Sequence, residues 1–186
     1  AAGAVPAQLG VEEDDEDELE RSMERALLGF DMLITSGGAS VGVHDLVRSV
    51  QKELRVEEVF WGVSIRPGKP VGFGMRRDHV VFNLPGNPVS ALVCFELFVR
   101  TAVNALLGLP QPLPSFQTGR LGATVGRNAE RDDFVRSRTL LEGDELVLEP
   151  LSGQESHMIV SAAHADAIVH VPRGDGELAA GAPVRF

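Results

Sequence analysis

The sequence predicts an α/β domain over residues 1–110, followed by a small all-β domain over residues 115–186. Before residue 110, short apolar runs alternate with amphipathic segments of helix length, whereas beyond residue 115 only short strand-like runs and glycine turns remain. Between the two parts, Pro110, Pro112 and Pro114 occupy alternate positions and indicate a stiff linker.

The composition is that of a globular protein, with 44% hydrophobic and 24% charged residues among 186. Its formal net charge of −10 disfavours a nucleic-acid or anionic-membrane partner. The single cysteine, Cys94, excludes a disulfide framework and is expected in the core. No apolar run approaches the ~20 residues that span a bilayer. The first ten residues lack the basic segment of a signal peptide, so we expect a cytoplasmic protein.

A stripe of apolar residues at helical spacing predicts the first helix: Leu19, Met23, Ala26, Leu27 and Phe30. Asp14 or Asp15 is a suitable N-cap, and Gly29 ends the helix. The acidic run over residues 12–20 suits the positive end of the helix dipole.

A buried strand is expected next, over Asp31–Thr35, followed by the glycine-rich segment SGGASVG and a helix that begins near His44. Val56–Ile65 is rich in valine, isoleucine and aromatic residues and predicts a strand that ends at the turn RPGKP, residues 66–70.

Val71–Met75 and His79–Leu84 then predict a hairpin. The segment LPGNP, residues 84–88, breaks the chain and opens a long helix that runs to about Leu107. In the second domain, four strands are expected: Phe134–Leu140, Glu145–Glu149, Ala167–Val171 and Pro183–Phe186.

Three segments of the first domain have residue types suited to binding anions. The SGGASVG loop precedes a helix and can offer backbone N–H groups to a phosphate, although a tight strand-to-helix turn explains its glycines equally well. Its glycine spacing matches neither the Walker nor the Rossmann motif. Asp45, in the first turn of the next helix, either compensates the dipole or coordinates a metal or ribose.

The RPGKP turn holds two cations, Arg66 and Lys69, in a strongly acidic chain, and is interpreted either as an oxyanion site or as a solvated turn. The LPGNP loop either presents backbone groups to a ligand or only caps the helix through Asn87. The histidines of the second domain lack the spacing of metal ligands: His157, His164 and His170.

Taken together, these segments are a far more specific signal of function than any one of them alone. The chain contains five such segments in this order: SGGASVGVHD, RPGKP, NLPGNPVSA, RDDFVRSRTL and GQESHMIVSAAHADAIVHVP. Their order and spacing resemble the molybdopterin molybdenumtransferase family, which includes MoeA and the gephyrin E domain. The resemblance extends from about Val11 to Phe186. It implies a MogA-like three-layer α/β domain, incomplete at its N-terminus, followed by a small β-barrel like MoeA domain IV.

The resemblance also implies a reaction in molybdenum cofactor biosynthesis. Members of this family are understood to bind adenylylated molybdopterin, to release AMP with Mg²⁺, and to insert molybdate into the dithiolene. Divalent magnesium prefers carboxylate oxygens, and the molybdate dianion prefers fixed cations and hydroxyl donors. Family members are usually homodimers.

Matching the motifs residue by residue gives the candidate site. Asp14 and Asp45 match the positions that support the metal, and with Lys69 they form the candidate catalytic set. The candidate residues for molybdopterin-AMP are Gly37, Gly38, Ser40, Pro85, Asn87 and Pro88. The candidate residues for molybdate are Arg66, Lys69, Arg136 and Ser156.

The sequence departs from the family pattern in three places. Arg66 stands where lysine is commoner, and a planar guanidinium cannot copy an ammonium. Asp166 adds a carboxylate where the family usually has Ala-Asn. The opening strand of the α/β domain, its acidic TGDEL-type segment and two preceding domains have no counterpart, so we expect an unpaired sheet edge and exposed apolar surface.

Two alternatives remain open. A MogA-type molybdopterin adenylyltransferase shares the glycine loop but lacks the β domain. A non-catalytic, gephyrin-like scaffold or dimerisation module shares the whole fold but would not need the anion set of Asp45, Lys69, Arg136 and Ser156.

We predict that the 186-residue chain binds nucleotide or pterin but does not turn over alone, because the segments that complete the family's site have no counterpart in it. An assay of molybdenum insertion with the isolated chain checks this expectation, and catalytic turnover would contradict it.

Overall fold

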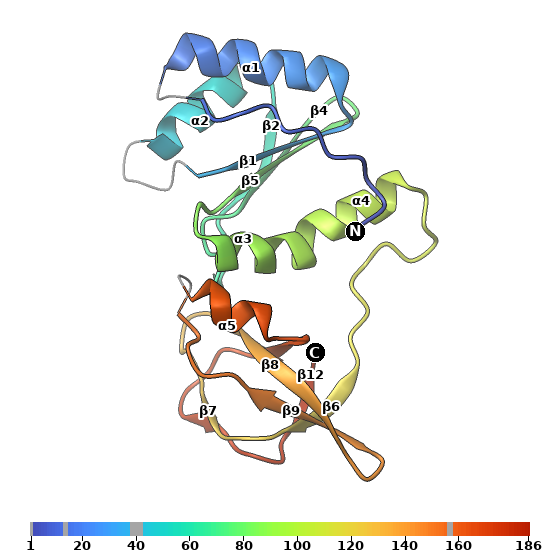
Figure 1. Ribbon diagram of the computed structural model, residues 1–186. Helices are drawn as coiled ribbons and strands as arrows, with labels where there is room; N and C mark the ends of the chain where they lie inside the picture. The colour runs from blue at the N-terminus through green and yellow to red at the C-terminus, as the bar shows by residue number, and fades with distance from the viewer. Residues whose placement is uncertain (1, 13–14, 38–42, 156–157) are drawn as a thin grey trace. The chain divides into compact units, whose positions relative to one another are not determined.

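The computed structural model describes residues 2–12, 15–37, 43–155 and 158–186 (Figure 1). The chain forms two compact units that interleave along the sequence. The first comprises Ala1–Val63, Pro70–Gly86 and Cys94–Leu113, and the second comprises Ser64–Lys69, Asn87–Val93 and Pro114–Phe186. The predicted domain boundaries at residues 110 and 115 stay a prediction.

The first unit is built on a four-stranded sheet with the order β1-β5-β4-β2. β1 (Met32–Ser36) pairs in parallel with β5 (His79–Leu84), which pairs antiparallel with β4 (Gly72–Arg76), and β4 pairs antiparallel with β2 (Glu57–Trp61). Among the described residues β1 is therefore an edge strand, as expected, and Ile34 on it is 41% exposed.

Helices lie on both faces of this sheet (Figure 1). α1 (Glu16–Gly29) and α2 (Val43–Glu53) pack on one face around a core that includes Leu27, Val50 and Val81. Asp15 is the N-cap of α1, and its Oδ1 accepts a hydrogen bond of 2.9 Å from the Glu18 N–H. The sequence prediction of an α/β domain is thus confirmed, with helices formed where apolar periodicity and capping agree.

The long helix after LPGNP is continuous but not uniform. It consists of α3 (Pro88–Cys94), a π-helical segment η1 (Phe95–Val99) and α4 (Arg100–Leu106). Cys94 is fully buried, as predicted, and burial raises the pKa of its thiol to about 12. The thiol is therefore protonated at neutral pH and unsuited to act as a nucleophile.

This helical run, Pro88–Leu106, corrects one expectation. Among the described residues it is the one helix long and apolar enough, by length and composition alone, to cross a membrane, with a mean hydropathy of 1.6. A search for uninterrupted apolar residues misses this helix, because Glu96 and Arg100, which form an ion pair of 2.6 Å, interrupt its apolar sequence. Core helices pass the same test, and Phe98 packs against Phe60 of β2. We therefore interpret the run as a core helix, of which Cys94–Leu106 belongs to the first unit and Pro88–Val93 to the second.

The predicted strand Val56–Ile65 was wrong as a single element. The structure divides it into β2 and a separate two-residue strand, β3 (Ile65–Arg66), in different sheets. Gly62 adopts φ +86° between them, and its N–H donates to the Val71 carbonyl, so the chain turns there. Positive φ favours glycine, which the strand-like composition of the segment concealed.

The second unit is a closed five-stranded barrel, which confirms the predicted all-β fold. Its strands are β6 (Thr118–Leu121), β8 (Asp132–Glu142), β9 (Glu145–Pro150), β10 (Ala167–Val171) and β12 (Pro183–Arg185), joined in the order β10-β12-β6-β9-β8 and closed by β8–β10 pairing. β3 extends it by pairing in parallel with β8, and a short helix, α5 (Ile159–Ala163), precedes β10. A separate ribbon pairs β7 (Val125–Gly126) with β11 (Glu177–Leu178). The core of the barrel includes Leu121, Val135 and Val169.

Asp132, the first residue of β8, ties β8 to β10 and the turn that follows. Its Oδ2 accepts a hydrogen bond of 2.8 Å from His170 Nε2, and its Oδ1 accepts one of 3.1 Å from the Arg173 N–H. These bonds, the His170 bond foremost, lower the pKa of the Asp132 carboxyl. They stabilise the ionised form and therefore the folded barrel.

We predict that Asp132→Asn lowers the melting temperature at neutral pH and that this difference shrinks in acid. Because the folded-state pKa is depressed, the stabilisation is present above the unfolded value of ~3.9 and is lost as pH falls through the folded value. Thermal melts between pH 7 and pH 3 measure the effect. The exposed Asp144→Asn in the same barrel is the control, and a pH-independent difference for Asp132→Asn would contradict the explanation.

Candidate functional site

The two predicted substrate loops lie at the carboxyl ends of neighbouring parallel strands. Pairing of β1 with β5 sets Thr35 opposite Asn83 and Ser36 opposite Leu84, so the SGGASVG loop and the LPGNP loop leave the sheet together. Ser36 Oγ also donates a hydrogen bond of 3.5 Å to the Pro85 carbonyl. Open α/β sheets bind ligands at this edge.

The backbones of these loops approach one another directly. A Cβ placed on Gly86 would lie 2.9 Å from the Cα of Gly37, closer than real Cβ atoms come to such a neighbour. Gly37 itself has φ +107°, a conformation that favours glycine. The backbones of Gly37 and Gly86 therefore lie side by side, and Gly86 has a packing role that the sequence did not show.

A buried polar network lies under the two loops. Asn83 Oδ1 accepts hydrogen bonds from Thr35 Oγ1 at 2.7 Å and from Gln51 Nε2 at 2.6 Å, and Asn83 Nδ2 donates to Gln51 Oε1 at 3.1 Å. It links β1 and β5 to α2. Sequence reasoning missed this network, whose only signal is an asparagine in the apolar strand before LPGNP and a glutamine on the apolar face of α2.

The remaining candidates for substrate binding are only partly described. Asn87 Oδ1 accepts a hydrogen bond of 3.2 Å from the Val89 N–H, and Pro88 is the first residue of α3, so both serve the start of the helix. Gly38 and Ser40 lie outside the described residues.

The two predicted metal ligands are not tested by the structure. Asp14 lies outside the described residues, and Asp45 is in the first turn of α2, with no description of its side chain. Ser49, one helical turn after Asp45, donates a hydrogen bond of 3.3 Å from Oγ to Glu16 Oε1, so the start of α1 lies beside α2. Within the described residues, no group of three His, Cys, Asp or Glu side chains could hold a metal.

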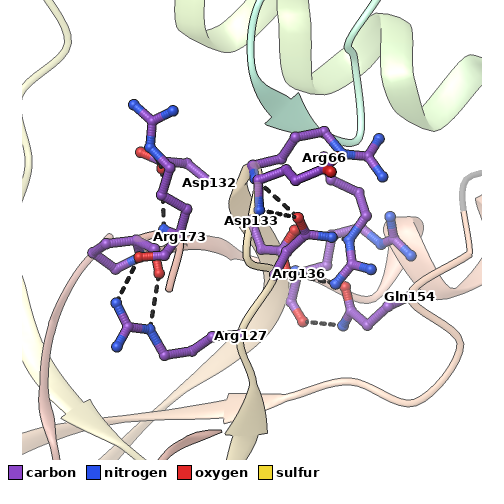
Figure 2. Close-up of polar contacts among 11 residues, drawn as sticks. Arg66, Arg127, Asp132, Asp133, Arg136, Gln154 and Arg173 are labelled. Atoms are coloured by element: carbon purple, nitrogen blue, oxygen red, sulfur yellow. Dashed lines mark hydrogen bonds and ion pairs between the residues drawn. The ribbon is translucent and has the colours of Figure 1, made fainter. Parts of the chain in front are cut away.

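The described members of the predicted molybdate set all belong to the second unit, while Ser156 lies outside the described residues. Lys69 is exposed in the turn that follows β3. Arg66 donates from Nε to Asp133 Oδ1 at 2.7 Å and from Nη2 to Oδ2 at 2.5 Å. Figure 2 shows this pair next to Arg136 and Gln154. Asp133 was not among the predicted residues.

Arg136 is the most unusual side chain of the second unit, because its residue is only 1% exposed. Residues 151–155 wrap around it: Gln154 exchanges two hydrogen bonds with its backbone, at 3.0 and 2.8 Å (Figure 2). Its Nη2 donates to the carbonyls of Gly153 at 2.7 Å and Glu155 at 3.4 Å.

Two donors of this guanidinium remain unused. Arg136 Nε and Nη1 are buried and have no hydrogen-bond partner within residues 2–12, 15–37, 43–155 and 158–186. Desolvation lowers the pKa of Arg136, but an arginine stays charged at neutral pH. A buried cation with unpaired donors is costly unless a ligand satisfies it, so this geometry fits an anion.

Comparison with known families agrees with these two parts. The model described as "Probable molybdopterin binding domain" matches residues 1–105, and the model described as "MoeA C-terminal region (domain IV)" matches residues 118–186. The chain is therefore a molybdopterin-binding type of α/β domain joined to a MoeA-type barrel.

Individual relatives give the same result. The chain is 30% identical to a molybdopterin molybdenumtransferase of Staphylococcus epidermidis and 33% identical to molybdopterin molybdenumtransferase 1 of Mycobacterium tuberculosis. Both alignments cover 94% of this chain and 42% of the relative. The chain belongs to the molybdopterin molybdenumtransferase, or MoeA, family, and spans well under half the length of these members.

A solved structure of a MoeA protein from Pyrococcus horikoshii supports the fold. It aligns with a TM-score of 0.74 at 32% identity, over 95% of this chain and 42% of that one. A second structure from the same organism, at 23% identity and a TM-score of 0.69, shows the fold alone.

We predict that Gly86→Ala weakens nucleotide binding and lowers stability by about 1–3 kcal/mol, because the new methyl group meets the Gly37 backbone rather than a flexible side chain. Thermal melts and calorimetric titration with AMP measure the two effects. Gly29→Ala is the control, since a Cβ there meets nothing within 4 Å. Wild-type stability and affinity in Gly86→Ala would show that the loops need no such close contact.

Proposed function

We propose that this chain acts in molybdenum cofactor biosynthesis, as the part of a molybdenumtransferase that binds molybdate and adenylylated molybdopterin. The single observation that carries the proposal is Arg136, a buried guanidinium whose Nε and Nη1 have no hydrogen-bond partner among the described residues. Membership of the MoeA family supplies the identity of the anion.

Molybdate is a tetrahedral dianion, and charge-assisted hydrogen bonds from a guanidinium suit such an oxyanion. Arg136 would donate them from Nε and Nη1, while the carbonyls of Gly153 and Glu155 hold its Nη2 in place. Lys69 is exposed and would add a second positive charge from a flexible stem, with Ser156 as a hydroxyl donor.

The adenylylated pterin would use the loops that follow β1 and β5. Gly37 and the LPGNP loop lie at the carboxyl ends of parallel strands, where backbone groups can approach phosphate oxygens without side-chain interference. The Thr35–Asn83–Gln51 network would keep both loops in place while the ligand enters and leaves.

Magnesium would be held by Asp14 and Asp45 together with phosphate oxygens and water, because Mg²⁺ usually takes only one or two carboxylates from a protein. The Ser49–Glu16 hydrogen bond supports this assignment, since it brings the beginning of α1 to the side of α2 one turn beyond Asp45. When bound, the ion would neutralise charge on the pyrophosphate that is cleaved.

The observations favour this function over the two alternatives. A MogA-type adenylyltransferase would not need the barrel, which contains Arg136. A scaffold would gain more stability from an apolar side chain than from a buried cation with unused donors. A homodimer in the cytoplasm remains part of the proposal, in keeping with the family.

Calorimetric titration of the chain with molybdate, and separately with AMP, each in the presence of Mg²⁺, tests the proposal. We expect saturable molybdate binding that Lys69→Ala and Arg136→Lys each weaken by about tenfold or more, because one loses a charge and the other loses the guanidinium donors. Arg136→Lys keeps the charge, which makes it the milder change at a buried position.

Arg138→Ala is the matched control, since Arg138 is an exposed arginine on the same strand, β8. Binding that is unaffected by both site variants would place the anion elsewhere. No molybdate binding by the folded wild-type chain would remove the anion site from this function.

A further inference from the structure

We propose that Asp133 is a positioning residue for the anion-binding turn, and that Arg66 acts through Asp133 rather than as a ligand of the anion. This inference rests on the proposed function, because the anion whose binding it affects is molybdate. It assigns Asp133 a role and replaces the role that the sequence suggested for Arg66.

Arg66 and Asp133 form a bidentate ion pair, which we call the clamp. The Asp133 side chain is 3% exposed and that of Arg66 is 53% exposed, so the guanidinium covers the carboxylate from the solvent side. Nε and Nη2 occupy the two carboxylate oxygens separately, the planar bidentate arrangement that only arginine can make. A lysine at position 66 could not make this arrangement.

The clamp acts on an otherwise weakly held segment. β3 has only two residues, and its parallel pairing sets Arg66 opposite Asp133 on β8. Beyond that pairing, the Asp132 N–H donates to the Ser64 carbonyl at 3.0 Å. The ion pair therefore joins the side chains at the point where the backbone pairing ends and the turn with Lys69 begins.

The charges of this pair also argue against Arg66 as a direct ligand of the anion. Asp133 compensates the positive charge of Arg66, so this pair adds little net attraction for an anion. Within the part of the chain that the structure describes, Lys69 forms no salt bridge, and Arg136 keeps two donors without a partner. Arg136 lies three residues after Asp133 on β8, so one strand holds both the clamp and the buried cation.

A double-mutant cycle on molybdate affinity tests the inference, with Arg66→Met, Asp133→Asn and the combined variant. Asp133→Asn removes a negative charge, so simple electrostatics predicts tighter molybdate binding, whereas loss of the clamp predicts weaker binding. We expect each single variant to weaken binding by about tenfold, and Arg66→Met to cost less than about twofold more when Asp133→Asn is present.

Two results of the cycle would overturn the inference. Unchanged or tighter binding by Asp133→Asn would leave the carboxylate without a positioning role. An equal loss from Arg66→Met in both backgrounds would make Arg66 a direct ligand. The control cycle uses Arg120→Met and Glu145→Gln, an exposed pair at 2.7 Å in the same barrel, which should leave affinity unchanged.

Arg66→Lys keeps the charge at an exposed position and tests the planar fork even if Asp133→Asn fails to fold. The clamp predicts that this variant loses as much affinity as Arg66→Met, and wild-type affinity would contradict it.

Amide hydrogen exchange over residues 66–69 separates this inference from the proposed function. We expect exchange at Gly68 and Lys69 to rise by about tenfold in Arg66→Lys, because the turn opens more often when the clamp is lost. If the wild-type chain binds no molybdate, the proposed function fails, and exchange still decides whether Asp133 holds the turn. Unchanged exchange would reject the clamp in either case.

Discussion

Strand β8 is the element on which the second unit depends, because three other strands pair with it. β9 and β3 hydrogen-bond to different parts of its length, and β10 closes the barrel against it. Three side chains of this strand contact other segments: Asp132 bonds to His170, Asp133 to Arg66, and Arg136 to the carbonyl of Gly153. A single strand thus fixes the barrel, the RPGKP turn and the buried guanidinium together.

In the first unit, strand pairing likewise fixes the positions at which loops begin. A parallel pair, β1 and β5, delivers two glycine-containing loops to one edge, and the buried amides beneath them fix their starting points. Polar groups in the core of a sheet are costly unless they bond one another, as Thr35, Asn83 and Gln51 do. These mutual hydrogen bonds offset the cost and fix the positions at which the two loops begin, as the proposed binding of substrate at this edge would require.

Local signals in the sequence were sufficient for most elements and for the family. Apolar periodicity and Asp15 define α1, and alternating runs define β9 and β10, because these patterns depend only on neighbouring residues. The prediction failed at Gly62, where a strand-like composition hides a positive φ. Asp133, Gln51 and Gly86 were missed because their partners lie 67, 32 and about 50 residues away, and no single-sequence pattern reports such contacts.

Burial gives Arg136 its functional meaning. An exposed arginine would bind an oxyanion weakly, since water competes for its donors and screens its charge. Enclosing the guanidinium in residues 151–155 removes that competition and uses one of its nitrogens, Nη2, to fix its orientation. Nε and Nη1 then remain as two buried donors, and each gains more from a bound anion than it would in water. Under the proposed function the energetic cost of keeping these donors unpaired is understandable, because the protein would have to bind and then release an anion.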